Sequence, residues 1–235
     1  MHSLSNMHAL FRDRIDAGQK LAISIEQVLK NKLSDVSIAW NELIVLAIPR
    51  GGIILAEIIA SYFNCDLDIL VTRKIRYEMN EEFAIGAVLP DGSYFLNDNV
   101  VKSIPISQRY LNQEIEIQKN EIERRLLEFR GTISYDDKLN NKIVILVDDG
   151  IATGSTIVAA AKWLKHNYNY KKLVIAVPVA PAESEVINRL DTIADALIIL
   201  YSPRQFSAVG QFYEEFDQVS DSEVKKIMKT YGYDI

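Results

Sequence analysis

Residues 143–156 read I-V-I-L-V-D-D-G-I-A-T-G-S-T, and this stretch establishes the fold class. Its first five residues, 143–147, are all apolar, which is typical of a strand buried on both faces of a parallel sheet. A short loop of acids, small residues and hydroxyls follows, and residues 154–166 then carry a helical pattern. This order predicts an α/β domain, in which ligands bind beyond the carboxyl ends of the strands.

The same alternation extends over much of the chain. Further strands are predicted at 43–48, 68–72, 173–177 and 196–200. Further helices are predicted at 14–32, 53–63 and 182–190, and a hairpin is predicted from 85–89 and 94–96. Ser220 and Glu223 form a capping box that opens a final helix. We therefore expect a mostly parallel central sheet flanked by helices.

Residues 106–129 lie outside this alternation and predict one long amphipathic helix. Two placements are open for it. It is either an insertion packed on the edge of its own domain or a helix that pairs with a partner across a dimer.

Composition excludes several classes of protein. The chain has 235 residues, 49% of them apolar, with only 10 Gly and 6 Pro, which argues against fibrous or disordered chains. A net charge of −6 argues against non-specific nucleic-acid binding, and no apolar run approaches the length of a membrane helix. A secretion signal is absent from the first residues, and the single cysteine, Cys65, cannot form an intramolecular disulfide. We expect a cytoplasmic protein with no membrane or nucleic-acid partner.

The loop after the 143–147 strand has the chemistry of a sugar-phosphate site. Backbone N–H groups and the positive end of the following helix suit a phosphate monoester. Thr153, Ser155 and Thr156 add hydroxyl donors, while Gly154 allows close approach of the backbone. The acids Asp148 and Asp149 suit hydroxyl groups of the same ligand, such as a ribose diol. An ordinary strand-to-helix turn with one capping Asp is the alternative, but it would need neither two acids nor three hydroxyls.

Other nucleotide and hydrolase motifs are missing from the sequence. The Walker A loop needs a lysine that this loop lacks, and neither G-x-G-x-x-G nor G-x-S-x-G occurs. The histidines, His2, His8 and His166, are scattered, so no zinc-binding spacing is present.

The segment VILVDDGIATGST resembles the phosphoribosyl pyrophosphate (PRPP) signature of the type I phosphoribosyltransferases. The resemblance extends from about Phe11 to the C-terminus. It is strongest to a branch of phosphoribosyltransferases with unassigned base, through P-R-G-G at 49–52, R-K at 73–74, E-F-A-I-G-A-V at 82–88 and P-x-x-F-x-A-V-G at 203–210. It implies the type I phosphoribosyltransferase fold as a single domain, 1–235. The core would be 11–97 and 141–200, with a helical insertion at 98–140 and a hood or C-terminal segment at 201–235.

The resemblance also implies roles for individual residues. Asp148 and Asp149 would hold the ribose hydroxyls, and Arg73 and Lys74 would complete the catalytic set at the pyrophosphate. The substrate-binding residues would be Ala152, Thr153, Gly154, Ser155 and Thr156 at the 5′-phosphate, and Arg50, Gly51 and Gly52 at the pyrophosphate. The Pro49–Arg50 bond would be a site for a strained or cis peptide, and residues 75–82, with Arg76, would be a mobile loop that closes over substrate. Phe206 would be either a base-stacking ring or a core aromatic.

The implied activity is transfer of the 5-phosphoribosyl group from PRPP to a purine or pyrimidine base, with release of pyrophosphate, as in nucleotide salvage. Mg²⁺ would be held mainly by PRPP, with Asp148 and Asp149 as the protein groups in reach. Ala152 stands where hypoxanthine and guanine relatives carry an Asp, so neither the acceptor base nor its acid/base partner follows from the sequence. The alternative is a non-catalytic regulator that binds PRPP. The resemblance also implies a homodimer.

Overall fold

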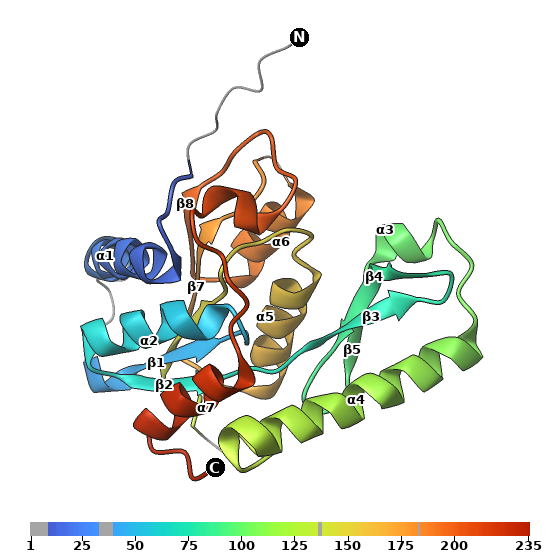
Figure 1. The fold of residues 1–235 in the computed structure, drawn as a ribbon, viewed down its shortest axis with the longest axis horizontal. Helices are drawn as coiled ribbons and strands as arrows, with labels where there is room; N and C mark the ends of the chain where they lie inside the picture. Colours follow the sequence, from blue (N-terminus) through green and yellow to red (C-terminus); the bar gives the residue numbers. More distant parts are fainter. Residues whose placement is uncertain (1–8, 33–39, 136–137, 183) are drawn as a thin grey trace.

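A computed structural model describes residues 9–32, 40–135, 138–182 and 184–235 (Figure 1). Five strands form a central, fully parallel sheet in the order β2-β1-β6-β7-β8. Their bounds are β1 Leu43–Ala47, β2 Asp66–Ile69, β6 Ile143–Val147, β7 Lys172–Val179 and β8 Ala196–Tyr201. The predicted parallel α/β sheet is confirmed, although β2 begins and ends earlier than the predicted strand at 68–72.

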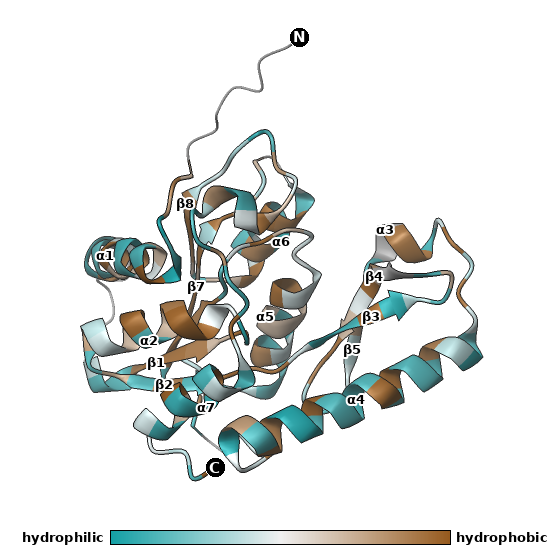
Figure 2. Cartoon of the chain, viewed as in Figure 1, coloured by the Kyte–Doolittle hydropathy of each residue, from teal (hydrophilic) through white to brown (hydrophobic). Residues whose placement is uncertain are grey.

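Helices cover both faces of this sheet. On one face α1 (Arg14–Lys32) packs on α2 (Gly52–Phe63), and on the other α5 (Ser155–Asn167) packs beside α6 (Glu185–Ile193). Every residue of β1 and β6 is buried, since both strands lie inside the sheet with helices above and below. Figure 2 shows the resulting contrast between apolar central strands and helices with polar outer faces.

A second, antiparallel sheet lies beside the first. It contains β3 (Arg73–Tyr77), β4 (Asn80–Val88) and β5 (Tyr94–Leu96), followed by the short α3 (Asp98–Val101) and the long α4 (Gln108–Arg130). The apolar stripe of α4 is buried against these strands, and its C-terminal part meets the last helix, α7 (Asp221–Thr230). The long helix therefore packs on its own chain, and the helical insertion expected at 98–140 belongs to a larger unit that includes the three strands.

The prediction that residues 75–82 form a loop is wrong. Most of this segment belongs to β3 and β4, which pair as an antiparallel hairpin with register shifts between Ile75 and Tyr77. Only Ile75 of β3 is fully buried, so the segment lacks the regular alternation that marks a strand in a sequence. The predicted hairpin formed by β4 and β5 is confirmed.

One ion pair joins this unit to the central sheet. Arg130, the last residue of α4, donates from Nε to Asp68 Oδ1 at 2.6 Å and from Nη2 to Asp68 Oδ2 at 2.8 Å. Both side chains are 0% exposed. The guanidinium also donates to the carbonyl oxygens of Thr132 and Ser134 and lies 4.1 Å from the ring centre of Tyr135.

The strand order places a switch point between β1 and β6. The chain proceeds from β1 outward to β2 and from β6 outward to β7, so the carboxyl ends of β1 and β6 are adjacent at the point where ligands bind in such sheets. The loops that follow them are residues 48–51 and 148–154. At the C-terminus, the predicted capping box of Ser220 and Glu223 is present at the start of α7. Within the described ranges, no helix combines the length and apolar character needed to cross a bilayer.

Candidate functional site

The loop after β6 forms an anion-sized hollow at the N-terminus of α5. Gly154 precedes the helix with φ of 70°, and a Cβ there would overlap Val186 Cγ1, so the turn requires glycine for two reasons. A cavity of about 200 Å³ opens above it. Its lining consists of Lys74, Asp148, Gly150, Ile151, Ala152, Thr153, Gly154, Thr156, Ile157 and Val209. Ser155 is buried and does not contribute to this lining.

The loop after β1 lies directly beside it. Ile48 donates its N–H to the carbonyl oxygen of Val147 at 2.9 Å, which extends the β1–β6 pairing to the loop, and the Pro49–Arg50 peptide is cis. Gly51 presses against the second acid, because a Cβ there would overlap Asp149 Oδ2. Gly52 packs closely on the backbone of β6, where a Cβ would lie 2.9 Å from Val147 O. The two loops are therefore packed tightly together.

A second cavity, of about 420 Å³, lies between these loops and the second sheet. Its basic lining residues are Arg50, Arg73, Lys74, Arg76 and Arg125, its acids are Asp148 and Asp149, and its remaining residues are Ile48, Pro49, Gly51, Thr72 and Thr156. Lys74, Asp148 and Thr156 line both cavities, which are therefore contiguous. The structure thus brings the four residues of the predicted catalytic set to one place.

The two acids are held in different ways. Asp148 Oδ1 accepts the backbone N–H of Asp149 at 2.8 Å, and burial beside the second carboxylate raises the pKa of Asp148 well above its ordinary value. Asp149 Oδ2 accepts from Arg14 Nε at 2.9 Å and lies 2.8 Å from Arg14 Nη2. Asp149 is therefore paired with a cation, and it lines the cavity at the same time.

Arg14 and Tyr213 support the site although no sequence pattern marks either of them. Arg14 opens α1, 135 residues before its partner, and its local pattern is that of an ordinary helix. Tyr213 donates its hydroxyl to the backbone carbonyl oxygen of Asp149 at 2.7 Å. Only the packing of distant segments brings these side chains to the β6 loop.

Arg125 and Thr72 were missed as well. Arg125 reaches the larger cavity from α4 with a side chain 17% exposed, and its Nε donates to Glu121 Oε1 at 2.7 Å. Arg73 donates from Nε to Gln118 on the same helix, and burial, together with Arg125 and Arg76, lowers its pKa. Thr72 Oγ1 is buried at the cavity and has no hydrogen-bond partner within the described part of the chain. A helical stripe in the sequence does not reveal which of its arginines will face a cavity.

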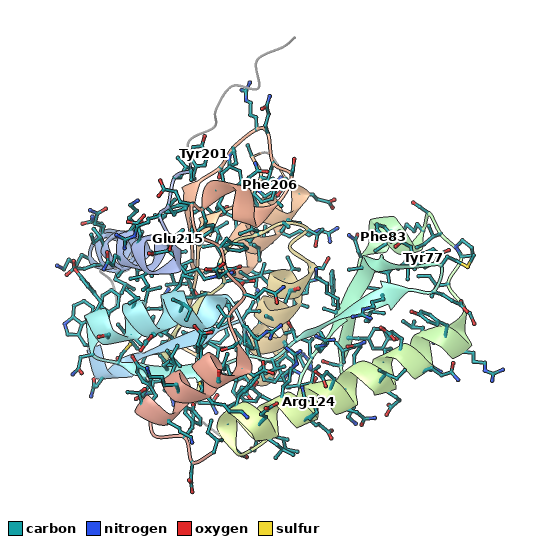
Figure 3. The ribbon with its side chains drawn as sticks, viewed as in Figure 1. Tyr77, Phe83, Arg124, Tyr201, Phe206 and Glu215 are labelled. Carbon is teal, nitrogen blue, oxygen red and sulfur yellow. The ribbon has the colours of Figure 1, made fainter. Side chains whose placement is uncertain are left out.

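Phe206 lies outside both cavities. Its ring packs on Phe212 at a centroid distance of 5.3 Å, and Figure 3 shows it beside Tyr201, away from Tyr77 and Phe83 on the second sheet. Val209, three residues further on, does line the smaller cavity. A base-stacking role for Phe206 stays a prediction.

Three comparisons with known proteins agree with one another. Residues 12–193 match the family model described as the phosphoribosyl transferase domain. Two strains of Mycobacterium tuberculosis carry a protein named "Putative phosphoribosyl transferase" that is 36% identical over 215 residues, which are 92% of this chain and 45% of the relative. The chain thus spans about half the length of the curated relatives it matches.

The crystal structure of TT1426 from Thermus thermophilus has the same fold. Its TM-score is 0.71 at 31% identity, and the match covers 94% of this chain and 98% of that one. Because the family model covers most of the sequence and a relative of matching length shares the fold, this chain belongs to the type I phosphoribosyltransferase family.

Proposed function

We propose that the protein transfers the 5-phosphoribosyl group of PRPP to a nitrogenous base and releases pyrophosphate. One observation carries the proposal: two contiguous cavities at the switch point of the sheet, one at a helix N-terminus and one lined by five basic side chains, with Asp148 and Asp149 at their junction. A ligand with a phosphate monoester at one end, a diphosphate at the other and hydroxyl groups between them matches this order.

The smaller cavity suits the 5′-phosphate. Backbone N–H groups at the start of α5 and the hydroxyls of Thr153 and Thr156 point to an anion there, and the helix dipole favours the negative charge. In this proposal Asp148 and Asp149 accept hydrogen bonds from the 2′ and 3′ hydroxyls of the ribose. The sugar is thereby held between two fixed anchor points.

The larger cavity suits the leaving pyrophosphate. Bond cleavage at the anomeric carbon leaves positive charge on the ribosyl group and negative charge on the departing oxygens, so donors fixed around those oxygens lower the barrier. We assign this role to Arg50, Arg73, Lys74 and Arg125, which come from three different parts of the chain. The carboxylates across the cavity are placed to face the positive ribosyl group.

A hard divalent cation fits this arrangement. Asp148 and Asp149 are the acids that line the larger cavity, and carboxylate oxygens are ligands that Mg²⁺ accepts. Among the described residues, no group of three His, Cys, Asp or Glu side chains is arranged to hold a metal. We propose that Mg²⁺ arrives with PRPP, whose oxygens provide most of its ligands, and neutralises charge on the leaving group.

The acceptor is proposed to enter beside Val209. This residue lines the smaller cavity, and the segment that carries it also contains Phe206. We therefore keep Phe206 as the candidate stacking surface. Phe206→Leu is expected to raise the KM for the acceptor several-fold with little effect on the KM for PRPP.

The test is release of pyrophosphate from PRPP and Mg²⁺ with a panel of purine and pyrimidine bases. Activity is expected with at least one base, and Asp149→Asn is expected to lower kcat/KM about 100-fold because the amide is a weaker acceptor and cannot pair with Arg14 as an anion. The matched control is Asp191→Asn on the exposed surface of α6, which should leave activity unchanged.

Two other outcomes would change the assignment. PRPP binding without pyrophosphate release for any base would support the regulator instead, and the absence of PRPP binding would exclude both functions. The proposed homodimer is tested separately by light scattering, which should give twice the chain mass of 26.6 kDa.

A further inference from the structure

Residues 10–15 and 212–217, which are distant in the sequence, lie side by side next to the loop that carries Asp149. The backbone N–H groups of Leu10 and Phe11 donate to the carbonyl oxygen of Phe212, and those of Glu214 and Glu215 donate back to the carbonyl oxygens of Phe11 and Arg12. These bonds place the first turn of α1 against residues 212–217. The pairing of these two segments brings the Arg14 side chain within reach of the loop after β6, from which it is distant in the sequence.

Two contacts besides the Asp149 carboxylate hold the Arg14 guanidinium. Its Nη1 donates to the carbonyl oxygen of Asp217 at 2.8 Å, and its guanidinium lies 3.8 Å from the ring centre of Phe216. The Phe216 ring packs in turn on Tyr213 at 4.8 Å, whose hydroxyl donates to the Asp149 carbonyl oxygen. The guanidinium therefore has a fixed position that does not depend on the carboxylate.

The Arg14 side chain contacts Asp149 from outside the substrate cavity. Arg14 is not among the residues that line the 420 Å³ cavity; it lines a separate cavity of about 320 Å³ with Ile54 and Val219. Nε and Nη2 both approach Oδ2, with side chains 11% and 16% exposed for Arg14 and Asp149. Gly51 packs against the same contact, since a Cβ there would overlap Asp149 Oδ2 and lie 3.1 Å from Arg14 Nε.

We propose that Arg14 is a positioning residue: it fixes the rotamer and the negative charge of Asp149 so that the carboxylate is set to accept the ribose hydroxyls before substrate arrives. This inference rests on the proposed function. Residues 10–15 and 212–217 thereby support the proposed PRPP site although Arg14 does not line the 420 Å³ cavity. A preorganised charged acceptor gains affinity because no rotamer has to be selected on binding.

The test compares two ligands that share only part of the site. Arg14→Met keeps an unbranched, though shorter, side chain on α1 and removes the donors, the charge and the guanidinium contact with Phe216. With Mg²⁺ present, calorimetry should show PRPP affinity about tenfold weaker, whereas affinity for inorganic pyrophosphate, which lacks the ribose hydroxyls that Asp149 is proposed to bind, should change much less. Arg14→Lys should recover part of the loss because it restores a cation.

Controls separate positioning from general damage. Arg12→Met removes a neighbouring arginine that is 64% exposed and paired with Asp13, and it should bind both ligands like the unaltered protein. If Arg14→Met does not fold, Phe216→Leu keeps both charges, removes the ring beneath the guanidinium, and should weaken PRPP binding less strongly but in the same direction.

Equal weakening of both ligands, or unchanged PRPP binding, in a folded Arg14 variant would overturn the inference while leaving the proposed function intact. Failure of the unaltered protein to bind PRPP would instead reject the proposed function, and this inference with it.

Discussion

Two arginine–aspartate pairs in this molecule have similar chemistry and opposite uses. In the Asp68–Arg130 pair, both carboxylate oxygens accept from the guanidinium, the backbone N–H of Ile69 adds a third bond, and both side chains are fully buried. In the Asp149–Arg14 pair, the two nitrogens share one oxygen and the carboxylate lines a cavity. When protein donors occupy the full hydrogen-bonding capacity of a carboxylate, that carboxylate serves to join two parts of the fold. A carboxylate whose hydrogen-bonding capacity is only partly occupied can still accept hydrogen bonds from a ligand.

The largest effect is expected when the buried Asp68–Arg130 pair is broken. Arg130→Met leaves Asp68 buried without its cation, and this should lower the free energy of unfolding by about 3–5 kcal/mol. Urea unfolding measures the change. The double variant Asp68→Leu with Arg130→Met should recover much of that loss, since no charge then remains buried. A single variant as stable as the original would mean that the pair does not hold the second unit to the sheet.

A smaller effect is expected when an added side chain crowds the Asp149–Arg14 pair. Gly51→Ala places a Cβ on Asp149 Oδ2, so the carboxylate must move, and we expect a stability loss of about 1–3 kcal/mol together with weaker PRPP binding. Thermal unfolding with and without PRPP measures both. Gly232→Ala, where an added Cβ meets nothing within 4 Å but φ is 85°, strains the backbone away from the site and is the control for PRPP binding, which it should leave normal. Unchanged binding by Gly51→Ala would show that the position of Asp149 is not critical.

Asp148 extends the comparison to an acid whose charge opposes folding. Burial beside Asp149 raises the pKa of Asp148 above its ordinary value of 3.8, so the folded state binds this proton more tightly than the unfolded chain. The contribution of Asp148 to the free energy of unfolding is therefore fully present at low pH. It is lost as the pH rises from the ordinary carboxyl pKa of the unfolded chain through the raised pKa of the folded state. Asp148→Asn should therefore stabilise the ligand-free protein at pH 7.

Unfolding of this variant and the original across a pH series tests that sign. The difference should vanish below about pH 3, where the carboxyl is protonated in both states. PRPP should stabilise the variant less than the original, since the neutral amide is a weaker acceptor than the carboxylate. A variant that is less stable than the original at pH 7 would contradict the assigned direction.

The smallest effect is expected on the solvent side of α4. Arg124 pairs with Glu121 and Glu128 at 2.6–2.7 Å, but its side chain is 53% exposed (Figure 3). Arg124→Met should change the free energy of unfolding by less than about 0.5 kcal/mol. The adjacent Arg125→Met, which faces the cavity, should instead weaken pyrophosphate binding. Similar binding by both variants would remove Arg125 from the leaving-group site.

Sequence reasoning reached the β1 and β6 loops because each loop is a local structure. Apolar runs identify the buried strands, Gly154 marks the turn before α5, and the paired acids fall at a strand end whatever the rest of the chain does. The strand β3 and the start of β4 escaped the same reasoning, since register shifts and a single buried residue in β3 erased the alternation there. The placement of α4 was left open because an apolar stripe does not identify the surface that covers it.

The order of residues along the chain was thus enough to establish the α/β fold class, the alternation of strand and helix, and the segments that surround the proposed phosphate site. Three-dimensional packing was needed to show that Arg14 holds Asp149, that Arg125 reaches the cavity from α4, and that Thr72 places a buried hydroxyl there. The physical reason is distance along the chain. Backbone pattern and turn chemistry act over a few residues, whereas a contact across 135 residues exists only after packing has brought its two ends together.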